Sequence, residues 1–186
     1  MAFMLIQTPD PSTIREALPD FTHTSHIFLP VNDCHQVDVA EGGSHWSLLV
    51  VSIIDRVAFH YDSLDSSNLP EAARATQKIS ILLGVNIRLH DLADSPQQDN
   101  SSDCGVFVCM QMQYLLEHRL LQVDKAGPVS MSLRGRTFNA SQGRKVMQRK
   151  IEEFRKEGER RRSRSPSPAR FGRRSMDKSR SPPRIA

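Results

Sequence analysis

The sequence predicts an α+β domain followed by a basic tail. Short apolar runs rich in β-branched residues alternate with segments whose apolar residues recur at helical spacing. Two of the β-rich runs, 46–54 and 57–61, are separated by only two residues, which is typical of a tight antiparallel pair. From residue 158 arginine, serine and proline dominate, so we expect a domain over residues 1–157 and a disordered tail over 158–186.

The N-terminal part is predicted to form strands around one short helix. Residues 3–6 and 27–31 are short apolar runs and are predicted strands. Between them, residues 11–18 open with Pro-Ser-Thr, an acceptable helix start. The run 46–54 is nearly continuously apolar, which indicates a central strand covered on both faces.

Three further helices are predicted in the domain. Residues 70–84 open with proline and glutamate and end in glycine, the expected start and stop signals. A short strand at 85–89 and a polar loop at 91–103 follow. Residues 104–121 are apolar at helical spacing and predict a buried helix, whereas the charged segment 142–156 predicts a surface helix.

Composition excludes several classes of protein. The 186 residues are 38% hydrophobic with a mean hydropathy of −0.44, and no apolar run approaches a membrane span. No secretory signal is visible, and the three cysteines are too few for a disulfide-built fold, which favours the cytosol or nucleus. Residues 1–143 carry a net charge of −7 and residues 144–186 one of +11, so the acidic body does not favour a nucleic-acid groove.

Cys104 is predicted at the start of a helix, directly after the polar loop. The helix dipole and the unpaired backbone N–H groups there favour thiolate and lower the pKa of a cysteine. Gly105 leaves room for a substrate backbone to approach the sulfur. A buried structural cysteine gives the same local pattern, so this feature alone leaves a nucleophile and an inert thiol both open.

The predicted hairpin offers a base and an orienting acid for such a nucleophile. His45 begins its first strand and Asp62 ends its second, and antiparallel pairing brings these ends together. His45 could accept the thiol proton while Asp62 holds its other ring nitrogen. His60 is the rival histidine, but its position within the strand favours a filler or surface role.

Acyl transfer also needs donors directed at the developing oxyanion. Gln98 in the polar loop, with the backbone N–H of Cys104, could provide them. Gln97 is an equal candidate on composition alone, and a glutamine in a loop is normally just solvated.

Taken in order, these motifs resemble the cysteine proteases that process ubiquitin-like modifiers, the sentrin/SUMO-specific group. The resemblance is carried by His45-Trp46, by Tyr61-Asp62-Ser63 and by Gln98-Asp99-Asn100-Ser101-Ser102-Asp103-Cys104-Gly105-Val106-Phe107-Val108-Cys109. The stretches 27–33 and 42–50 look most like the deneddylase branch of this family. The resemblance extends over residues 3–157, and its segment around the cysteine is highly specific.

The resemblance implies a papain-like cysteine protease fold with a mixed central sheet and a catalytic helix. The residues it implies in catalysis are His45, Asp62, Gln98 and Cys104. It places Gln98 rather than Gln97 at the oxyanion hole, and Trp46 along a narrow channel that admits a modifier's Gly-Gly tail. The implied activity is that of a peptidase or isopeptidase that matures or removes a ubiquitin-like modifier, of the neddylation type or SUMO, without a cofactor.

Family members also carry a Trp-Leu-Asn-Asp-like segment before the first strand, whose tryptophan helps to roof the channel. The sequence starts after that position, so we expect a domain truncated at its N-terminus that holds the Gly-Gly tail from one side only. The alternative function is therefore a non-catalytic or weakly active relative that binds a modifier without cutting it.

The other cysteines and the tail give further expectations. Cys109 lies about 140° round the helix from Cys104 and is predicted to be core. Cys34 and His35 lack the additional ligands of a zinc site, so no metal is expected. The Arg-Ser and Ser-Pro pairs of 158–186 resemble the tails of nuclear RNA-processing proteins. We expect a monomer in nucleus and cytoplasm, with weak RNA or nuclear-import contacts through this tail and no membrane contact.

Overall fold

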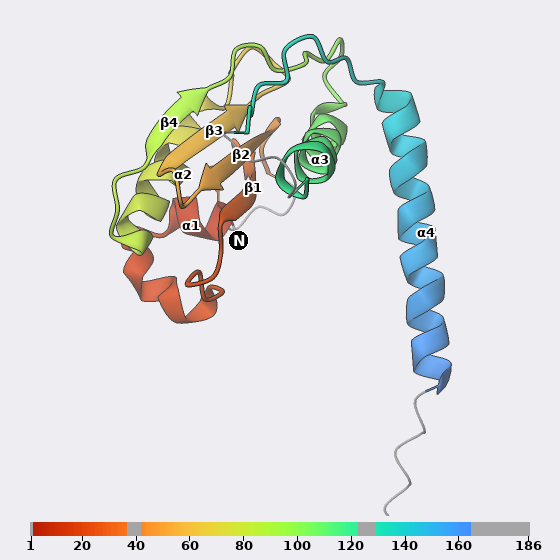
Figure 1. Ribbon diagram of the computed structural model, residues 1–186, viewed down its shortest axis with the longest axis horizontal. Helices are drawn as coiled ribbons and strands as arrows, with labels where there is room; N and C mark the ends of the chain where they lie inside the picture. Colours follow the sequence, from red (N-terminus) through yellow and green to blue (C-terminus); the bar gives the residue numbers. More distant parts are fainter. Residues whose placement is uncertain (1, 37–41, 123–128, 165–186) are drawn as a thin grey trace, which may run out of the picture. The chain divides into compact units, whose positions relative to one another are not determined.

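The computed structural model describes residues 2–36, 42–122 and 129–164, and the chain divides into two units, Met1–Val146 and Met147–Ala186. The first unit is built around a four-stranded sheet in the order β1-β2-β3-β4 (Figure 1). The strands are β1 (His26–Asn32), β2 (Trp46–Ser52), β3 (Val57–Tyr61) and β4 (Arg88–Asp91). The first three are antiparallel neighbours and β4 runs parallel to β3, which confirms the predicted mixed sheet.

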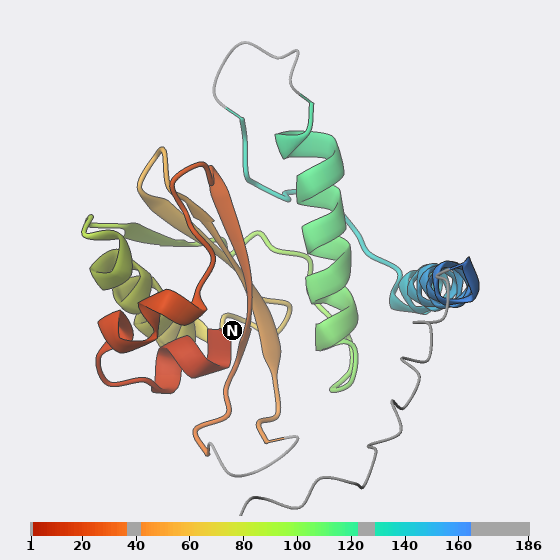
Figure 2. The ribbon, with the colours of Figure 1, turned by 90° about the horizontal axis from the view of Figure 1, so that it is seen from below.

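Helices cover both faces of this sheet (Figure 2). One face carries α1 (Ala2–Gln7), the 3-10 helix η1 (Pro11–Ala17) and α2 (Leu69–Leu83). The other face carries α3 (Cys104–Leu115), which continues into a π-helical turn, η2 (Leu116–Leu120).

Strand β2 contributes to the core on both sides of the sheet. Leu49 and Val51 pack into the cluster with α2, whereas Leu48 and Val50 pack into the cluster with α3. All four side chains are fully buried. Because successive residues of a strand point to opposite faces, a strand covered on both sides must be apolar throughout. The predicted central strand is therefore confirmed.

The start and stop signals of α2 act as predicted. Pro70 lies in the first turn, where its missing N–H costs no helical hydrogen bond. Gly84 ends the helix with a positive φ of 66°, and its N–H donates to the last turn. The left-handed conformation favours a residue without Cβ, which explains why the helix ends here.

Two predicted strands differ from the structure. Residues 3–6 belong to α1 and not to a strand, because four apolar residues fit either conformation until their neighbours are known. Leu5 is buried in the α2 cluster while Met4 is 56% exposed, as expected for one face of a helix. The strand predicted at 85–89 instead covers Arg88–Asp91, since the backbone of Val85 is still bonded to the end of α2.

The last helix, α4 (Ala140–Arg164), begins in the first unit and continues into the second. It runs seven residues past the predicted boundary at 157, so the expectation of disorder is wrong for 158–164. Ion pairs one turn apart support the exposed helix, including Glu157 with Arg161 at 2.5 Å. Residues 165–186 lie outside the described part of the chain, where the predictions about the tail stay predictions. In the described ranges, no helix is long and apolar enough to cross a membrane.

Candidate active site

His45 and Asp62 meet at the end of the hairpin, as their positions in the sequence predict. Leu48 pairs with Tyr61, so the register, continued by one residue, places Asp62 opposite Ser47 and makes His45 its diagonal neighbour. His45 Nε2 lies 2.6 Å from Asp62 Oδ1, and both side chains are buried. The predicted proximity is confirmed.

The Asp62 carboxylate is held by backbone donors as well as by the histidine. Its Oδ2 accepts from the N–H of Asn68 at 2.9 Å, and its Oδ1 accepts from the N–H of Leu64 at 2.9 Å. Burial by itself would raise the pKa of Asp62, but the hydrogen bonds from His45, Asn68 and Leu64 outweigh burial and lower it. Asp62 is therefore a carboxylate at neutral pH, the charge state needed to orient an imidazole.

The backbone of His45 is fixed from three directions by side chains that the sequence did not single out. Asn32 and Asn68 each donate a side-chain N–H to the carbonyl of His45, at 3.0 and 3.3 Å. Asp33 accepts from the N–H of His45 at 3.0 Å. The signal available in the sequence was their position, since Asn32 ends β1, Asp33 follows it and Asn68 precedes α2.

His60 is a second buried histidine paired with an aspartate. Its Nδ1 lies 2.7 Å from Asp91 Oδ1 and its Nε2 lies 3.0 Å from Ser47 Oγ. The side chain is fully buried, which excludes the surface role, and its Nε2 also lies 3.9 Å from Asp62 Oδ2. By contrast, within the described residues His45 has no hydrogen bond at Nδ1. Of these two buried histidines, His45 is the one with a ring nitrogen available for a thiol proton.

Cys104 is the first residue of α3, as predicted, and is buried. Helix α3 packs against β2, and the two elements start at the same end of the sheet (Figure 2). This places Cys104 at the end of the sheet at which His45 precedes β2. In the described residues no hydrogen bond joins Cys104 to His45 or to Gln98, so the catalytic assignment stays a prediction.

The two candidate glutamines have different surroundings. Gln97 is tied into its loop, because its amide N–H groups donate to the carbonyls of Asp62 and Ser95 and its Oε1 accepts from Asp65 N. Gln98 Oε1 accepts from Ser63 Oγ at 2.7 Å, and its Nε2 donates to the carbonyl of Asn100 at 2.5 Å. Asn100 thus engages one N–H of the Gln98 amide, and an oxyanion role uses the second N–H or a turn of the amide toward the substrate.

Trp46 follows His45 directly and begins β2. By strand alternation its side chain shares a face with Leu48 and Val50, the face that α3 covers. It is 43% exposed, unlike the rest of β2. A half-exposed indole beside the base fits the predicted role as a channel wall, which no contact in the structure tests.

The other two cysteines have different surroundings, and the backbone N–H of Cys34 donates to the Asn32 side chain that bonds His45. Cys109 is exposed, so its prediction as core is wrong: it lies on the outer stripe of α3 with Gly105 and Gln113. Cys34 is buried, and its thiol is 3.3 Å from the carbonyl of Gln36. Among the described residues, no three His, Cys, Asp or Glu side chains are grouped to hold a metal ion.

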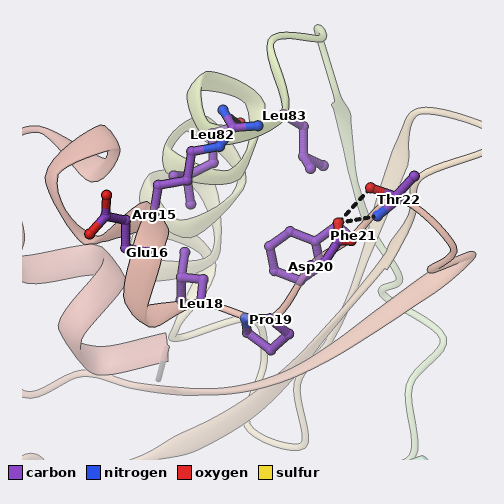
Figure 3. A pocket seen from close by; sticks show the side chains of 9 residues that line it. All are labelled: Arg15, Glu16, Leu18, Pro19, Asp20, Phe21, Thr22, Leu82 and Leu83. Carbon is purple, nitrogen blue, oxygen red and sulfur yellow. Dashed lines mark hydrogen bonds between the residues drawn. The ribbon is translucent and has the colours of Figure 1, made fainter.

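A cavity of about 440 Å³ lies on the opposite side of the sheet, between η1 and the end of α2 (Figure 3). It is lined by Arg15, Glu16, Leu18, Pro19, Asp20, Phe21, Thr22, Leu82 and Leu83. None of the predicted site residues lines it. The hollow results from how the N-terminal segment packs, with Arg15 donating to the carbonyl of Leu82 at 3.3 Å.

Comparison with known proteins agrees with the motif resemblance. Residues 6–156 match the model of the Ulp1 protease family, C-terminal catalytic domain. NEDD8-specific protease 2 of Schizosaccharomyces pombe is 40% identical over 134 residues, which cover 72% of this chain and 32% of that protein. Sentrin-specific protease 8 of Mus musculus is 35% identical over 102 residues, 53% of this chain and 44% of that protein.

Among solved structures, the chain is similar to the SUMO protease Ulp1 with its catalytic cysteine oxidised to a sulfinic acid. The identity is 24%, the TM-score is 0.39, and the match covers 55% of this chain and 46% of that one. The chain thus spans about a third of the yeast NEDD8-specific protease and less than half of the mouse protein.

Proposed function

Because this chain belongs to the Ulp1 protease family, we propose that it is a cysteine-type peptidase or isopeptidase that cleaves after the C-terminal Gly-Gly of a ubiquitin-like modifier. The observation that carries the proposal is the buried His45–Asp62 pair, 2.6 Å apart, at the end of the sheet where α3 starts. In the part of the chain that the structure describes, the other ring nitrogen of His45 has no hydrogen bond. A base held by a carboxylate, together with a cysteine at a helix start, is what thiol-based acyl transfer requires.

The residues take the following roles in the proposed reaction. His45 Nδ1 accepts the Cys104 thiol proton, while Asp62 keeps Nε2 protonated and fixes the ring. The thiolate attacks the carbonyl carbon of the terminal glycine, and the backbone N–H of Cys104 and the Gln98 amide stabilise the oxyanion. The imidazolium then protonates the leaving amine, and a water molecule activated by His45 hydrolyses the thioester, which restores the thiol.

The substrate class follows from the relatives and from Trp46. Relatives at 40% and 32% identity carry names that specify NEDD8, which favours a modifier of the neddylation type over SUMO. Trp46 presents an exposed indole next to the base, where a wide side chain in the last two substrate positions would collide with it. Two glycines avoid this collision and permit the close approach of their backbone.

An activity-based probe tests the proposal directly. Modifiers of the NEDD8, SUMO and ubiquitin types, each with a C-terminal vinyl sulfone, are incubated with the protein and with its Cys104→Ala and Cys109→Ala variants. We expect one adduct, strongest with the NEDD8-type probe, that is lost in Cys104→Ala and retained in Cys109→Ala. Peptide mass spectrometry identifies the labelled thiol.

Cys109→Ala is the matched control, because it removes an exposed thiol from the same helix. An adduct on Cys34 or Cys109 would contradict the assignment of the nucleophile. Saturable binding of the unmodified modifier without any adduct would support the alternative, a relative that binds a modifier without cutting it.

A further inference from the structure

The residue directly before the candidate nucleophile holds its carboxylate in an unusual position. Asp103 occupies the N-cap position of α3, where an aspartate normally accepts a hydrogen bond from the first-turn N–H groups. It makes no such bond here. Its Oδ2 instead accepts from Asn100 Nδ2 at 2.7 Å, and its Oδ1 accepts from Arg144 Nη1.

Arg144 reaches this point from the start of α4. Besides bonding Asp103, it donates from Nη2 to the carbonyl of Ser102 at 3.0 Å, so one guanidinium holds two consecutive residues before Cys104. Asn100 completes the arrangement, because its Oδ1 accepts from the N–H of Ser102 at 2.9 Å. The loop before α3 is therefore fixed from both sides.

The first turn of α4 is placed by close packing against α3. A Cβ added at Gly143 would lie 2.5 Å from Met110 Sδ and 3.0 Å from Val106 Cγ1, so only glycine allows this approach without displacing those side chains. The Phe138 ring lies 6.1 Å from that of Phe107, edge to face. These contacts hold the segment just before Arg144 against the helix that begins with Cys104.

We propose that Arg144 is a positioning residue that holds the Asp103 carboxylate away from the start of α3, leaving the first N–H groups of the helix to the Cys104 thiolate and the oxyanion. This rests on the proposed function of Cys104 as the nucleophile. The two acceptors compete for the same donors: a carboxylate that caps the helix satisfies them, and it also places a negative charge beside the sulfur.

The charged and titratable groups around the start of α3 come from three elements. Asp103 comes from the preceding loop, Arg144 from α4, and His45 from the residue before β2. The ion pair with Arg144 neutralises Asp103, and the hydrogen bond from Asn100, followed by Arg144, lowers the pKa of this carboxyl. Removing Arg144 leaves Asp103 charged and held by Asn100 alone of these two partners, so the carboxylate can turn toward the helix by exchanging that one hydrogen bond.

A double-mutant cycle distinguishes this role from simple bracing. The rate of Cys104 alkylation by iodoacetamide is measured against pH for the wild type, Arg144→Ala, Asp103→Ala and the double variant, with peptide mass spectrometry to separate the three cysteines. We expect the apparent pKa of Cys104 to rise by about one pH unit in Arg144→Ala, return to near the wild-type value in the double variant and fall in Asp103→Ala.

Arg144→Lys and Arg155→Ala complete the set. Arg144→Lys keeps the charge but loses the planar guanidinium that bonds both Asp103 and Ser102, so we expect an intermediate shift of the alkylation profile. Arg155→Ala removes an exposed arginine that pairs with Glu152 on the same helix and is expected to leave the profile unchanged. Thermal unfolding of each variant checks that it is folded under the conditions of the alkylation assay.

Two results would overturn the proposal: an unchanged profile in Arg144→Ala, or a double variant as impaired as Arg144→Ala. Alkylation requires no modifier, so this outcome is independent of the probe experiment. The protein could react with none of the modifier probes while Arg144→Ala still shifts the pH profile of Cys104 alkylation. That result would reject the proposed substrate and retain the positioning role of Arg144.

Discussion

Two histidine–aspartate pairs lie within the same sheet at nearly the same distance, 2.6 Å for His45 and Asp62 and 2.7 Å for His60 and Asp91. The distances do not distinguish them, and both histidines are buried, although the side chain of Asp91 is 24% exposed and that of Asp62 only 1%. The difference that bears on chemistry is the second ring nitrogen. Ser47 Oγ engages that of His60, whereas among the described residues nothing bonds that of His45. A histidine with both nitrogens bonded is a structural link, whereas one with a free nitrogen can move a proton.

The largest expected difference between the pairs is in activity. His45→Ala removes the proposed base, so we expect cleavage of a fluorogenic Gly-Gly modifier to fall roughly 10²–10⁴-fold. Stability should change little, by about 1 kcal/mol, because Asp62 keeps the N–H donors of Asn68 and Leu64. Initial rates measure the activity, and urea unfolding measures the stability. A His45→Ala variant that keeps its activity would show that the two pairs do not differ in this way.

The second pair should show the reverse pattern. His60→Ala leaves a cavity and strips Asp91 and Ser47 of a buried partner, so we expect the free energy of unfolding to fall by about 2–4 kcal/mol. The rate per folded molecule should stay within about threefold of wild type, since no proposed proton transfer passes through His60. Asp62 lies 3.9 Å from His60 Nε2, but the N–H groups of Asn68 and Leu64 still hold its carboxylate. A rate loss as large as that of His45→Ala, at a temperature where the variant is folded, would assign His60 to the chemistry.

The smallest effect concerns acid pH. Hydrogen bonds hold the pKa of Asp62 below its ordinary value despite burial, so its stabilising contribution is complete above that value and disappears as pH falls through the lowered pKa. Asp62→Asn lacks this titration. We therefore expect the stability difference between wild type and Asp62→Asn to shrink between about pH 5 and pH 2, which unfolding at each pH measures. A constant difference would show that Asp62 does not titrate in this way.

The parts of the site that the sequence predicted are those governed by local rules. The hairpin ends brought His45 and Asp62 together because a tight antiparallel turn leaves one register for two apolar strands. Cys104 at the start of α3 followed from a polar loop meeting an apolar helical pattern. These features depend on neighbours in sequence or on a single turn.

The parts that the sequence missed depend on contacts made across the fold. Cys109 is exposed because the faces of α3 that become buried are set by β2 and by α4, which the helical angle from Cys104 alone does not reveal. Arg144 meets Asp103 across 41 positions of chain, and nothing local distinguishes it from other arginines of α4. The four apolar residues before position 7 became helical because of what they pack against.

The register between β2 and β3 decides whether His45 and Asp62 meet, so their contact depends on correct strand pairing. A slip of one residue would send the Asp62 side chain to the opposite face of the sheet, and a slip of two would shift it along the strand by about 7 Å. Either error could leave a compact molecule with an apolar centre, but neither would leave a base in contact with its acid. Only molecules whose β2–β3 hairpin formed in the native register would thus turn over substrate.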